Sequence, residues 1–419
     1  MTEMSENPSS HWSRRKEKIE RSWEKLLFNH LLRSETVAMR DKVIALAELG
    51  LCNQLQHESD AVCFASPDPV VRQGWALKKQ VEHEFCDRYA GRTDERVLIQ
   101  VPPPGYSPAG YSLFTNLAES LEFMGVPTRI LKWDDETTKV IDSFSPTVLL
   151  TSDHHSYLAQ IDWAAIARYK QVNRLRIGLT ASLEEYENTP LNDRLKWSAK
   201  NGTDFFYTFR DKEYVTTRDG YQPFFDAGYP MVYLPFGANI LHYYPVAGFD
   251  RDLDYVIMAT RKSEHISYMK YIVRQYIGFI DGPGWRHVRD FRFNRARDRY
   301  IYARAKVGLN VHLPEQIDWA CEVNERTYQL AACGVPQLID HPKLLGRLFS
   351  SSSLYIADGP TEYMRLFKNI IDQPEDAVQR ALLAQEEVFS RHTTFHRADS
   401  FMLQLDGALP CSTTPYVGQ

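Results

Sequence analysis

The 419-residue sequence lacks any apolar run long enough to cross a bilayer, and residues Met1 to Ser10 are polar, without the apolar core of a signal peptide. We therefore expect a cytoplasmic protein, neither secreted nor spanning a membrane. The six cysteines show no C-x-x-C spacing, a pattern typical of reduced thiols rather than of a zinc site. A net charge of −5 argues against a dedicated nucleic-acid binder, because such proteins are usually basic.

No segment repeats at a short fixed period, which argues against a solenoid. The loop at residues 102–110 is rich in proline and glycine but lacks the Gly-Lys-Ser/Thr ending of a P-loop. What is present is an ordinary globular composition, with 43% apolar and 25% charged residues. A chain of this length suits two domains and an additional segment.

Residues 1–92 carry helical patterns and no catalytic motif, so we interpret them as a helical accessory segment. One helix is predicted at residues 35–49, ended by Gly50, and a later helix starts with Ser66 as its N-cap. Basic side chains precede these helices at Arg14, Arg15, Lys16 and Lys18. We expect residues 1–90 to pack on the remainder of the chain, or to make a peripheral contact with a membrane or a contact within an oligomer.

From Arg96 onward the pattern changes to alternating strands and helices, which predicts parallel sheets covered on both faces. Predicted strands lie at residues 97–101, 129–133, 147–151, 176–180, 204–208 and 231–234, and the alternation restarts with a strand at 253–259. We place Rossmann-like domains at residues 93–250 and 251–405, with a tail at 406–419. The predicted fold class is α/β: two Rossmann-like domains facing a cleft, preceded by an all-helical segment.

The most informative segment runs from Asn324 to Asp340. Its residues show helical spacing up to Gly334, a natural helix terminator, and Val335 to Ile339 is predicted to be a buried strand. The helix is expected to begin between Asn324 and Thr327. A helix start beside the carboxyl ends of parallel strands is a place where α/β proteins hold a diphosphate, because the helix dipole favours an anion there.

This segment resembles the donor-binding segment of GT-B glycosyltransferases, in particular those related to the spore maturation protein CgeB. The ordered pieces of the resemblance, across residues 250–405, are Gln329, Ala332-Cys333-Gly334, Leu338-Ile339-Asp340, Leu345 to Phe349, and His392 to Arg397. The resemblance implies an enzyme that moves a sugar from a nucleotide-sugar donor, by analogy a UDP-sugar, to an acceptor hydroxyl. It also implies no metal ion and no cofactor, because most enzymes of this fold stabilise the leaving diphosphate with cationic side chains and a helix start.

The resemblance places the donor in the second domain. Candidate donor contacts are Arg261, Lys262, Trp285, Asn324, Glu325, Arg326, Thr327 and Gln329. Arginine suits phosphate oxygens because its planar fork binds two at once, and an aromatic ring can stack on a base. Alternatives stay open: Arg261 as a solvated loop residue and Trp285 as a core residue. Arg326 could equally pair with Glu322. The family usually has glutamate where Gln329 stands, and glutamine accepts hydrogen bonds from ribose hydroxyls without a charge.

The first domain is expected to bind the acceptor. Asp153, His154 and His155 follow a buried strand and are the candidates for the catalytic base, since histidine titrates near neutral pH. A base at this position favours inversion of the anomeric centre, and its absence favours retention. By position, Tyr106 and Ser107 resemble the loop that approaches the substrates in this fold, although a turn without a ligand is the simpler account. A zinc site at the two histidines is a weaker interpretation, because spacing supplies no third ligand.

Two other functions stay open. Nucleotide-sugar epimerases share the fold but need carboxylates near the sugar in both halves. A non-catalytic GT-B scaffold that recruits a partner through its helical N-terminus is the alternative that Gln329 supports. No motif in the sequence encodes the sugar, or whether the acceptor is a glycan, a protein or a small molecule.

Overall fold

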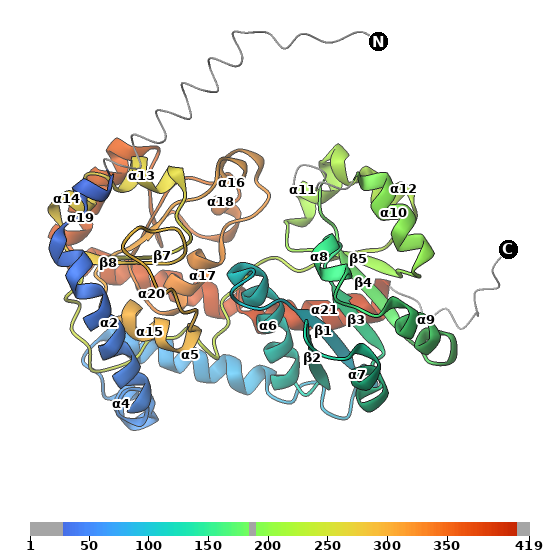
Figure 1. The fold of residues 1–419 in the computed structure, drawn as a ribbon. Helices are drawn as coiled ribbons and strands as arrows, with labels where there is room; N and C mark the ends of the chain where they lie inside the picture. Colours follow the sequence, from blue (N-terminus) through green and yellow to red (C-terminus); the bar gives the residue numbers. More distant parts are fainter. Residues whose placement is uncertain (1–27, 184–189, 409–419) are drawn as a thin grey trace, which may run out of the picture. The chain divides into compact units, whose positions relative to one another are not determined.

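The computed structural model describes residues 28–183 and 190–408, and the chain divides into two compact units (Figure 1). Unit 1 comprises Met1–Trp75, His242–Ile317 and Leu330–Gln385, and unit 2 comprises Ala76–Leu241, Asp318–Gln329 and Glu386–Gln419. Each unit therefore combines stretches that are far apart in the sequence. The contiguous domain boundaries expected from the sequence stay predictions, and the basic residues at positions 14–18 lie outside the described residues.

Unit 2 contains a six-stranded parallel sheet in the order β2-β1-β3-β4-β5-β6. Its strands are β1 Val97–Val101, β2 Thr128–Lys132, β3 Val148–Thr151, β4 Arg176–Thr180, β5 Phe205–Thr208 and β6 Met231–Tyr233. Val97 pairs with both Thr128 and Val148, which fixes the register at the centre of the sheet. Strands β1, β3 and β5 are buried along their whole length, as expected for strands covered on both faces. The strand order reverses between β1 and β3, and open α/β sheets bind ligands outside the carboxyl ends of strands at such a point.

Helices cover the sheet of unit 2. They are α6 Pro108–Phe123, α7 Thr137–Phe144, α8 His155–Leu158, α9 Trp163–Val172, α10 Leu191–Lys200, α11 Lys212–Thr217, the 3-10 turn Asp219–Tyr221, α12 Gln222–Asp226 and α21 Thr394–Ala408. Helix α6 packs against β1, β2 and α21. It begins directly after Ser107, whose Oγ accepts a hydrogen bond from the Gly110 amide (3.1 Å), and Pro108 occupies the first helical position.

Unit 1 contains a five-stranded parallel sheet in the order β11-β10-β9-β7-β8. Its strands are β7 Tyr255–Met258, β8 Gly278–Asp281, β9 Gly308–Asn310, β10 Gln337–Ile339 and β11 Tyr355–Ile356. Around them lie α13 Ser263–Met269, α14 Ile272–Gln275, α15 Arg295–Ala303, α18 Leu345–Leu348 and α19 Pro360–Asp372. The division between the units passes through α5 Pro69–Phe85, α16 Pro314–Trp319, α17 Glu325–Ala332 and α20 Pro374–Arg391. The order of this sheet reverses between β7 and β9.

The predicted N-terminal helical segment is present and belongs to the packing of unit 1. Its helices are α2 Ser34–Cys52, α3 Leu55–Glu58 and α4 Asp60–Phe64, followed by α5. Helix α2 packs on β8 and α15, as Figure 1 shows at the blue end of the described chain. Arg40 donates two hydrogen bonds to Oδ1 of the buried Asp281, at 3.0 and 2.7 Å. The buried Glu58 carboxylate accepts from Nε of Arg299 (2.8 Å) and from the Tyr244 hydroxyl (2.5 Å). These buried contacts make the helices part of the core of unit 1.

Two local expectations for these helices are wrong. Helix α2 continues through Gly50 to Cys52, so Gly50 is not its terminator. Its role is close packing, because a Cβ at this position would lie 2.7 Å from the Tyr300 ring. Helix α5 starts at Pro69, and the side chain of Asp68 accepts a hydrogen bond from the Val70 amide (2.9 Å). Asp68 therefore caps the helix, and not Ser66 as the sequence suggested.

Within residues 28–183 and 190–408, no helix combines the length and the apolar character that crossing a bilayer requires.

Candidate functional site

Helix α17 begins where the sequence predicts, at Glu325 directly after Asn324. The side chain Oδ1 of Asn324 accepts hydrogen bonds from the amide (3.2 Å) and the hydroxyl (3.3 Å) of Thr327, so Asn324 caps the helix. The amino end of a helix carries partial positive charge, which favours an anion close by. The predicted helix start is thus confirmed, and a diphosphate bound there stays a prediction.

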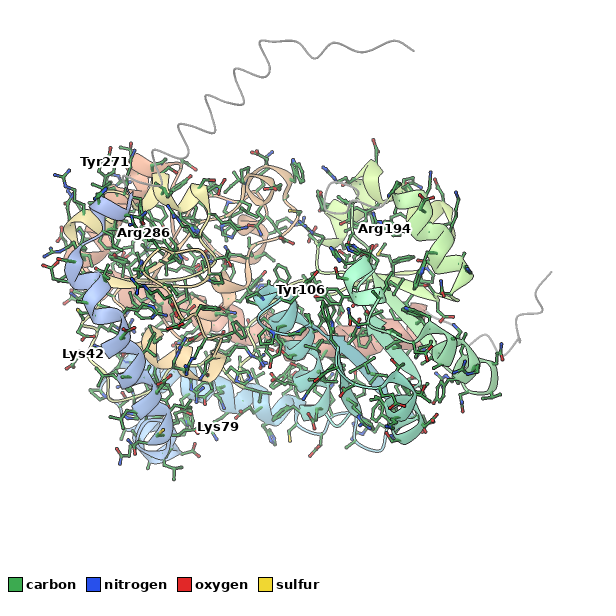
Figure 2. The ribbon with its side chains drawn as sticks, in the orientation of Figure 1. Lys42, Lys79, Tyr106, Arg194, Tyr271 and Arg286 are labelled. Atoms are coloured by element: carbon green, nitrogen blue, oxygen red, sulfur yellow. The ribbon has the colours of Figure 1, made fainter. Side chains whose placement is uncertain are left out.

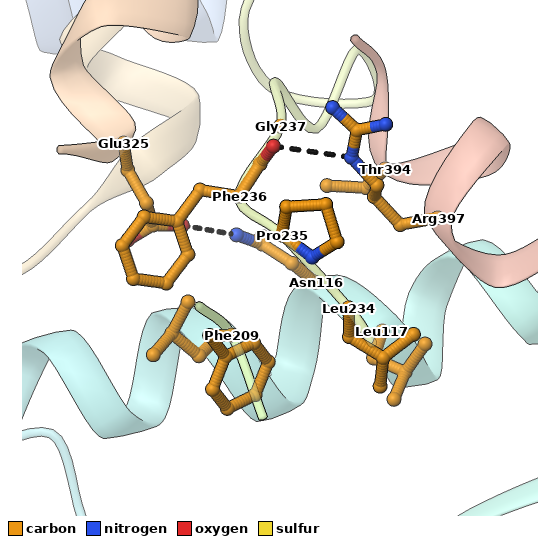
Figure 3. A pocket seen from close by; sticks show the side chains of 11 residues that line it. Asn116, Leu117, Phe209, Leu234, Pro235, Phe236, Gly237, Glu325, Thr394 and Arg397 are labelled. Atoms are coloured by element: carbon orange, nitrogen blue, oxygen red, sulfur yellow. Dashed lines mark hydrogen bonds between the residues drawn. The ribbon is translucent and has the colours of Figure 1, made fainter. Parts of the chain in front are cut away.

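The carboxylate of Glu325 is held by side chains of helix α6. Oε1 of Glu325 accepts hydrogen bonds from Nδ2 of Asn116 (2.9 Å) and from Oγ of Ser112 (3.4 Å). Asn116 is itself fixed, because its Oδ1 accepts a hydrogen bond from Asn239 (3.0 Å). This network orients Glu325 toward the pocket shown in Figure 3.

The pocket lies within unit 2 and holds about 350 Å³ of unfilled space, part of it open to solvent. It is lined by Leu113, Asn116, Leu117, Phe209, Leu234, Pro235, Phe236, Gly237, Glu325, Thr394 and Arg397. The rings of Phe209 and Phe236 stack with centroids 5.9 Å apart, so one wall is aromatic. A mainly apolar lining with a few converging polar groups is typical of small-molecule sites.

Arg397 supplies the positive charge of this pocket. Its Nε donates to the Phe236 carbonyl (3.1 Å), as Figure 3 shows. Its Nη1 donates to the Arg391 carbonyl (3.2 Å), and its Nη2 lies 2.8 Å from Nδ1 of His392. Burial lowers the pKa of the Arg397 guanidinium. Within residues 28–183 and 190–408 no carboxylate forms an ion pair with it. These partners are two backbone carbonyls and an imidazole, which engage three of its five N–H groups.

Arg326 and Gln329 extend the polar surface of α17. Gln329 follows Glu325 by four residues and Arg326 by three, so the three side chains lie on neighbouring faces of the helix. Arg326 and Gln329 are both half-buried. Glu322, the alternative partner considered for Arg326, pairs with Nε of Arg210 at 3.2 Å.

Arg261 and Lys262 follow β7 in unit 1, next to the strand-order reversal of that sheet. The Arg261 amide donates to the Pro283 carbonyl (2.8 Å), and the guanidinium lies 5.9 Å from the centre of the Trp285 ring. Lys262 is exposed, and its amide donates to Nδ1 of His265 (3.1 Å). Both cations lie at the carboxyl edge where a phosphate contact is predicted.

Trp285 lies in the core of unit 1, the alternative that the sequence left open. Only 3% of its surface is exposed, and its indole Nε1 donates to the Ala259 carbonyl (2.8 Å). Phe28 and His265 pack on it with centroids 5.8 and 5.9 Å away. A role in stacking on the donor base stays a prediction, and any such base would have to share the ring with these neighbours.

A buried pair at the ends of β9 and β10 was not foreseen as a pair. Nδ1 of His312 lies 2.6 Å from Oδ1 of Asp340, and the His312 amide donates to Oδ2 (2.7 Å). The carboxylate fixes the orientation of the imidazole ring. From the sequence only Asp340 was named, and not His312, and their contact depends on the neighbouring positions of β9 and β10 in the sheet.

Asp153, at the end of β3, is buried and bound by several donors. Its carboxylate accepts from the hydroxyls of Thr180 and Ser182, both at 2.7 Å, and forms an ion pair with Arg194. These contacts join the ends of β3 and β4 to helix α10. A general base needs a lone pair directed at its substrate. The structural contacts of Asp153 compete with that role, which stays a prediction.

His154 and His155 are more accessible than Asp153. The His154 ring is half-buried and its Nδ1 accepts from the Ser156 amide (3.2 Å), which caps helix α8. The His155 ring is exposed and stacks on His154 with centroids 4.6 Å apart. Of the three predicted base candidates, the two histidines are therefore the more exposed.

Tyr106 and Ser107 lie in the loop between β1 and α6, and Figure 2 labels Tyr106 at the amino end of that helix. Half of the Tyr106 surface is exposed, and its ring packs on Trp133 with centroids 4.6 Å apart. Ser107 caps α6, so its hydroxyl already has a structural partner. Contact of either residue with a substrate stays a prediction.

Sequence reasoning missed the pocket residues Asn116, Phe209 and Arg397. They come from three segments that only the fold brings together, although Arg397 ends the predicted His392–Arg397 motif.

Among the described residues, no group of three or more histidine, cysteine or acidic side chains has the arrangement of a metal site.

Comparison with known proteins gives one family match. Residues 273–403 match the family model "Glycosyl transferase-like", and this span contains the start of α17, the His312–Asp340 pair and Arg397. No curated protein matches the sequence.

Several solved structures are similar to this chain. A mutant of T4 phage BGT in complex with UDP-glucose is 10% identical, with a TM-score of 0.51, over 75% of this chain and 99% of that chain. Sucrose-phosphate synthase from Thermosynechococcus elongatus is 12% identical over 75% and 99% of the two chains, with a TM-score of 0.44. An Anabaena protein in complex with UDP-glucose is 10% identical over 74% and 99%, with a TM-score of 0.43. The predicted fold class is confirmed: this chain has two Rossmann-like parallel sheets of the GT-B type, preceded by helices, and a segment similar to glycosyl transferases.

Proposed function

We propose that this protein is a cytoplasmic, metal-independent glycosyltransferase of the group related to CgeB, which moves a sugar from a nucleotide-sugar donor, in the first instance a UDP-sugar, to an acceptor hydroxyl. The proposal rests above all on three features that occur together in one segment. The segment similar to glycosyl transferases contains a helix start with an anion-favouring dipole, an oriented carboxylate at Glu325 and a pocket arginine without an acidic partner among the described residues.

The donor would be held by the polar groups at the start of α17. The diphosphate would lie at the amino end of the helix, with Arg326 balancing its charge. Gln329, one turn further on, would accept from a ribose hydroxyl through its amide oxygen. Within unit 1, Arg261 and Lys262 stay the candidate cations for a phosphate contact. UDP is the first nucleotide to test, because the T4 phage and Anabaena structures contain UDP-glucose.

The reaction needs one proton removed and one bond exchanged. The acceptor oxygen forms a bond to the anomeric carbon as the bond from that carbon to the diphosphate oxygen breaks, and the diphosphate leaves with both bonding electrons. The acceptor proton passes to an imidazole nitrogen of His154 or His155. Asp153 holds the loop that carries these histidines.

A thermal-shift panel tests nucleotide binding. The protein is heated with UDP, GDP, CMP or dTDP at millimolar concentration, and a ligand at 100 times its Kd stabilises the folded state by about 2.7 kcal/mol. We expect one nucleotide, UDP first, to raise Tm selectively. Arg326→Gln should reduce this shift, whereas Lys42→Gln, at an exposed position on α2, should leave it unchanged.

Two outcomes would count against the proposal. No shift with any nucleotide favours the non-catalytic scaffold. A shift without release of nucleoside diphosphate from any UDP-sugar, measured with a range of acceptors, favours binding without transfer.

A further inference from the structure

Three aromatic side chains of unit 2 form a contiguous cluster, here called the aromatic platform: Tyr106, Trp133 and Tyr157. The ring centroids of Tyr106 and Trp133 are 4.6 Å apart, those of Trp133 and Tyr157 are 5.4 Å apart, and those of Tyr106 and Tyr157 are 6.4 Å apart. Each of the three rings therefore contacts the other two. Tyr157 is buried and forms the base of the platform, while Tyr106 is 50% exposed and Trp133 is half-buried.

The platform stands at the ligand-binding edge of the six-stranded sheet. Tyr106 lies in the loop after β1, Trp133 directly follows β2, and Tyr157 lies in α8 after β3. These three strands are neighbours, and the strand order reverses between β1 and β3. Rings from three separate loops therefore meet at the position where open α/β sheets place their ligands.

Polar groups surround the rings. The His154 ring, a candidate for the catalytic base, lies 6.3 Å from Tyr157 and stacks on the exposed His155. The indole Nε1–H of Trp133 is buried and has no acceptor in the described part of the chain, so it is a donor that the protein leaves unsatisfied. The loop also has room, because a Cβ added to Gly105 would meet no atom within 4 Å.

We propose that the aromatic platform binds a pyranose ring of the acceptor, so that the acceptor is a glycan. A pyranose presents C–H groups on its faces and hydroxyls at its rim, which matches aromatic faces bordered by an indole N–H and imidazole nitrogens. Converging aromatic rings suit the C–H face of a sugar ring. That this ligand is the acceptor rests on the proposed glycosyl transfer, and a sugar ring here would lie close to the histidines that take its proton.

The test measures carbohydrate binding directly, without any nucleotide. The probes are maltohexaose, cellohexaose, xylohexaose, mannohexaose and chitohexaose, with resorcinol as an aromatic probe that has no sugar ring. Binding is followed by saturation-transfer difference NMR on the ring C–H protons, and Kd is obtained by titration. The variants are Tyr106→Ala, Tyr106→Phe and Trp133→Phe. Tyr271→Ala is the matched control, since Tyr271 is 47% exposed and lies in unit 1 (Figure 2).

We expect at least one hexaose to bind the unmodified protein. Tyr106→Ala should weaken it about tenfold, Tyr106→Phe should stay within about twofold because the ring is kept, and Tyr271→Ala should match the unmodified protein. Trp133→Phe should weaken binding severalfold, because it removes ring area and the indole N–H.

The proposal is overturned if no hexaose binds, if binding survives both Tyr106→Ala and Trp133→Phe, or if resorcinol binds and the hexaoses do not. The last result would assign the platform to an aromatic ligand. The nucleotide thermal shift is measured on the same variants and should not change, so failure of the glycan site can be told apart from failure of the glycosyltransferase proposal.

Discussion

The substitution Gln329→Glu tests the role of α17 in holding the donor. Gln329 is half-buried on the same helix as Glu325 and Arg326, and no hydrogen bond of its side chain to another described residue is seen. If its amide oxygen accepts from the ribose, glutamate at this position places a charged acceptor at the same point. The nucleotide should then bind more tightly.

The size of the effect follows from two opposing terms. Hydrogen bonds to charged groups contribute about 1.5–3 kcal/mol, against about 0.5–1.5 kcal/mol for neutral ones, so one or two ribose bonds gain about 1–2 kcal/mol. This is about 5- to 30-fold in Kd. The new carboxylate also repels Glu325 across one helical turn, at a cost of about 0.2–0.5 kcal/mol in stability, and Arg326 lies close enough to offset part of it.

Isothermal titration with UDP and with 2′,3′-dideoxy-UDP gives the measurement. We expect Gln329→Glu to bind UDP about 5- to 30-fold more tightly than the unmodified protein does. Its affinity for the dideoxy nucleotide should equal that of the unmodified protein, because the gain requires the ribose hydroxyls. Gln329→Ala should lower the affinity for UDP and leave the affinity for the dideoxy nucleotide unchanged. An unchanged UDP affinity in a variant with normal Tm, or an equal gain for both nucleotides, would refute the ribose contact.

Three further predictions concern the folded state of unit 1. Glu58→Gln should lower the free energy of unfolding by about 3 kcal/mol in urea denaturation, because it leaves the buried guanidinium of Arg299 without its carboxylate, and a change below about 1 kcal/mol would contradict this. Burial raises the pKa of Asp298 to about 6, whereas the pKa in the unfolded chain is near 4. The protonated carboxyl therefore stabilises the folded state fully below pH 4, and the free energy of unfolding falls by about 3 kcal/mol as pH rises through 6. In Asp298→Asn this slope between pH 4 and 6 should vanish, and an unaltered profile would show that another group causes it. Gly282→Ala should cost at least about 2 kcal/mol, because φ is +132° and a Cβ would lie 2.2 Å from a backbone carbonyl oxygen, whereas Gly346→Ala meets no atom within 4 Å and should change stability little.

The sheets and the motif helix could be predicted because their signals are local. Mostly apolar runs mark strands such as β1, β3 and β8, which are buried along their whole length. The capping side chain of Asn324 and the glycine at position 334, with a φ of +67°, mark the two ends of α17. Local signals were also misleading where packing decided the outcome. Gly50 lies inside a helix, and a glycine stands there because the Tyr300 ring packs where a Cβ would lie.

The candidate site was less predictable because its contacts join distant segments. Asp153 meets Arg194, which is 41 residues away, through the neighbouring ends of β3 and β4. Arg397 reaches the Phe236 carbonyl across 161 residues, and no local pattern encodes such a pairing. Trp285 illustrates the remaining difficulty: a tryptophan after a Gly-Pro-Gly turn suits a ligand or a core equally, and only the packing of Phe28 on it decides for the core.

A crystal structure of the protein with UDP bound tests the central claim most directly. The account predicts pyrophosphate oxygens about 3 Å from the backbone amides in the first turn of α17, with the ribose next to Gln329. If that helix start is instead covered by side chains while the nucleotide lies elsewhere, the assignment of this chain as a nucleotide-sugar glycosyltransferase is contradicted.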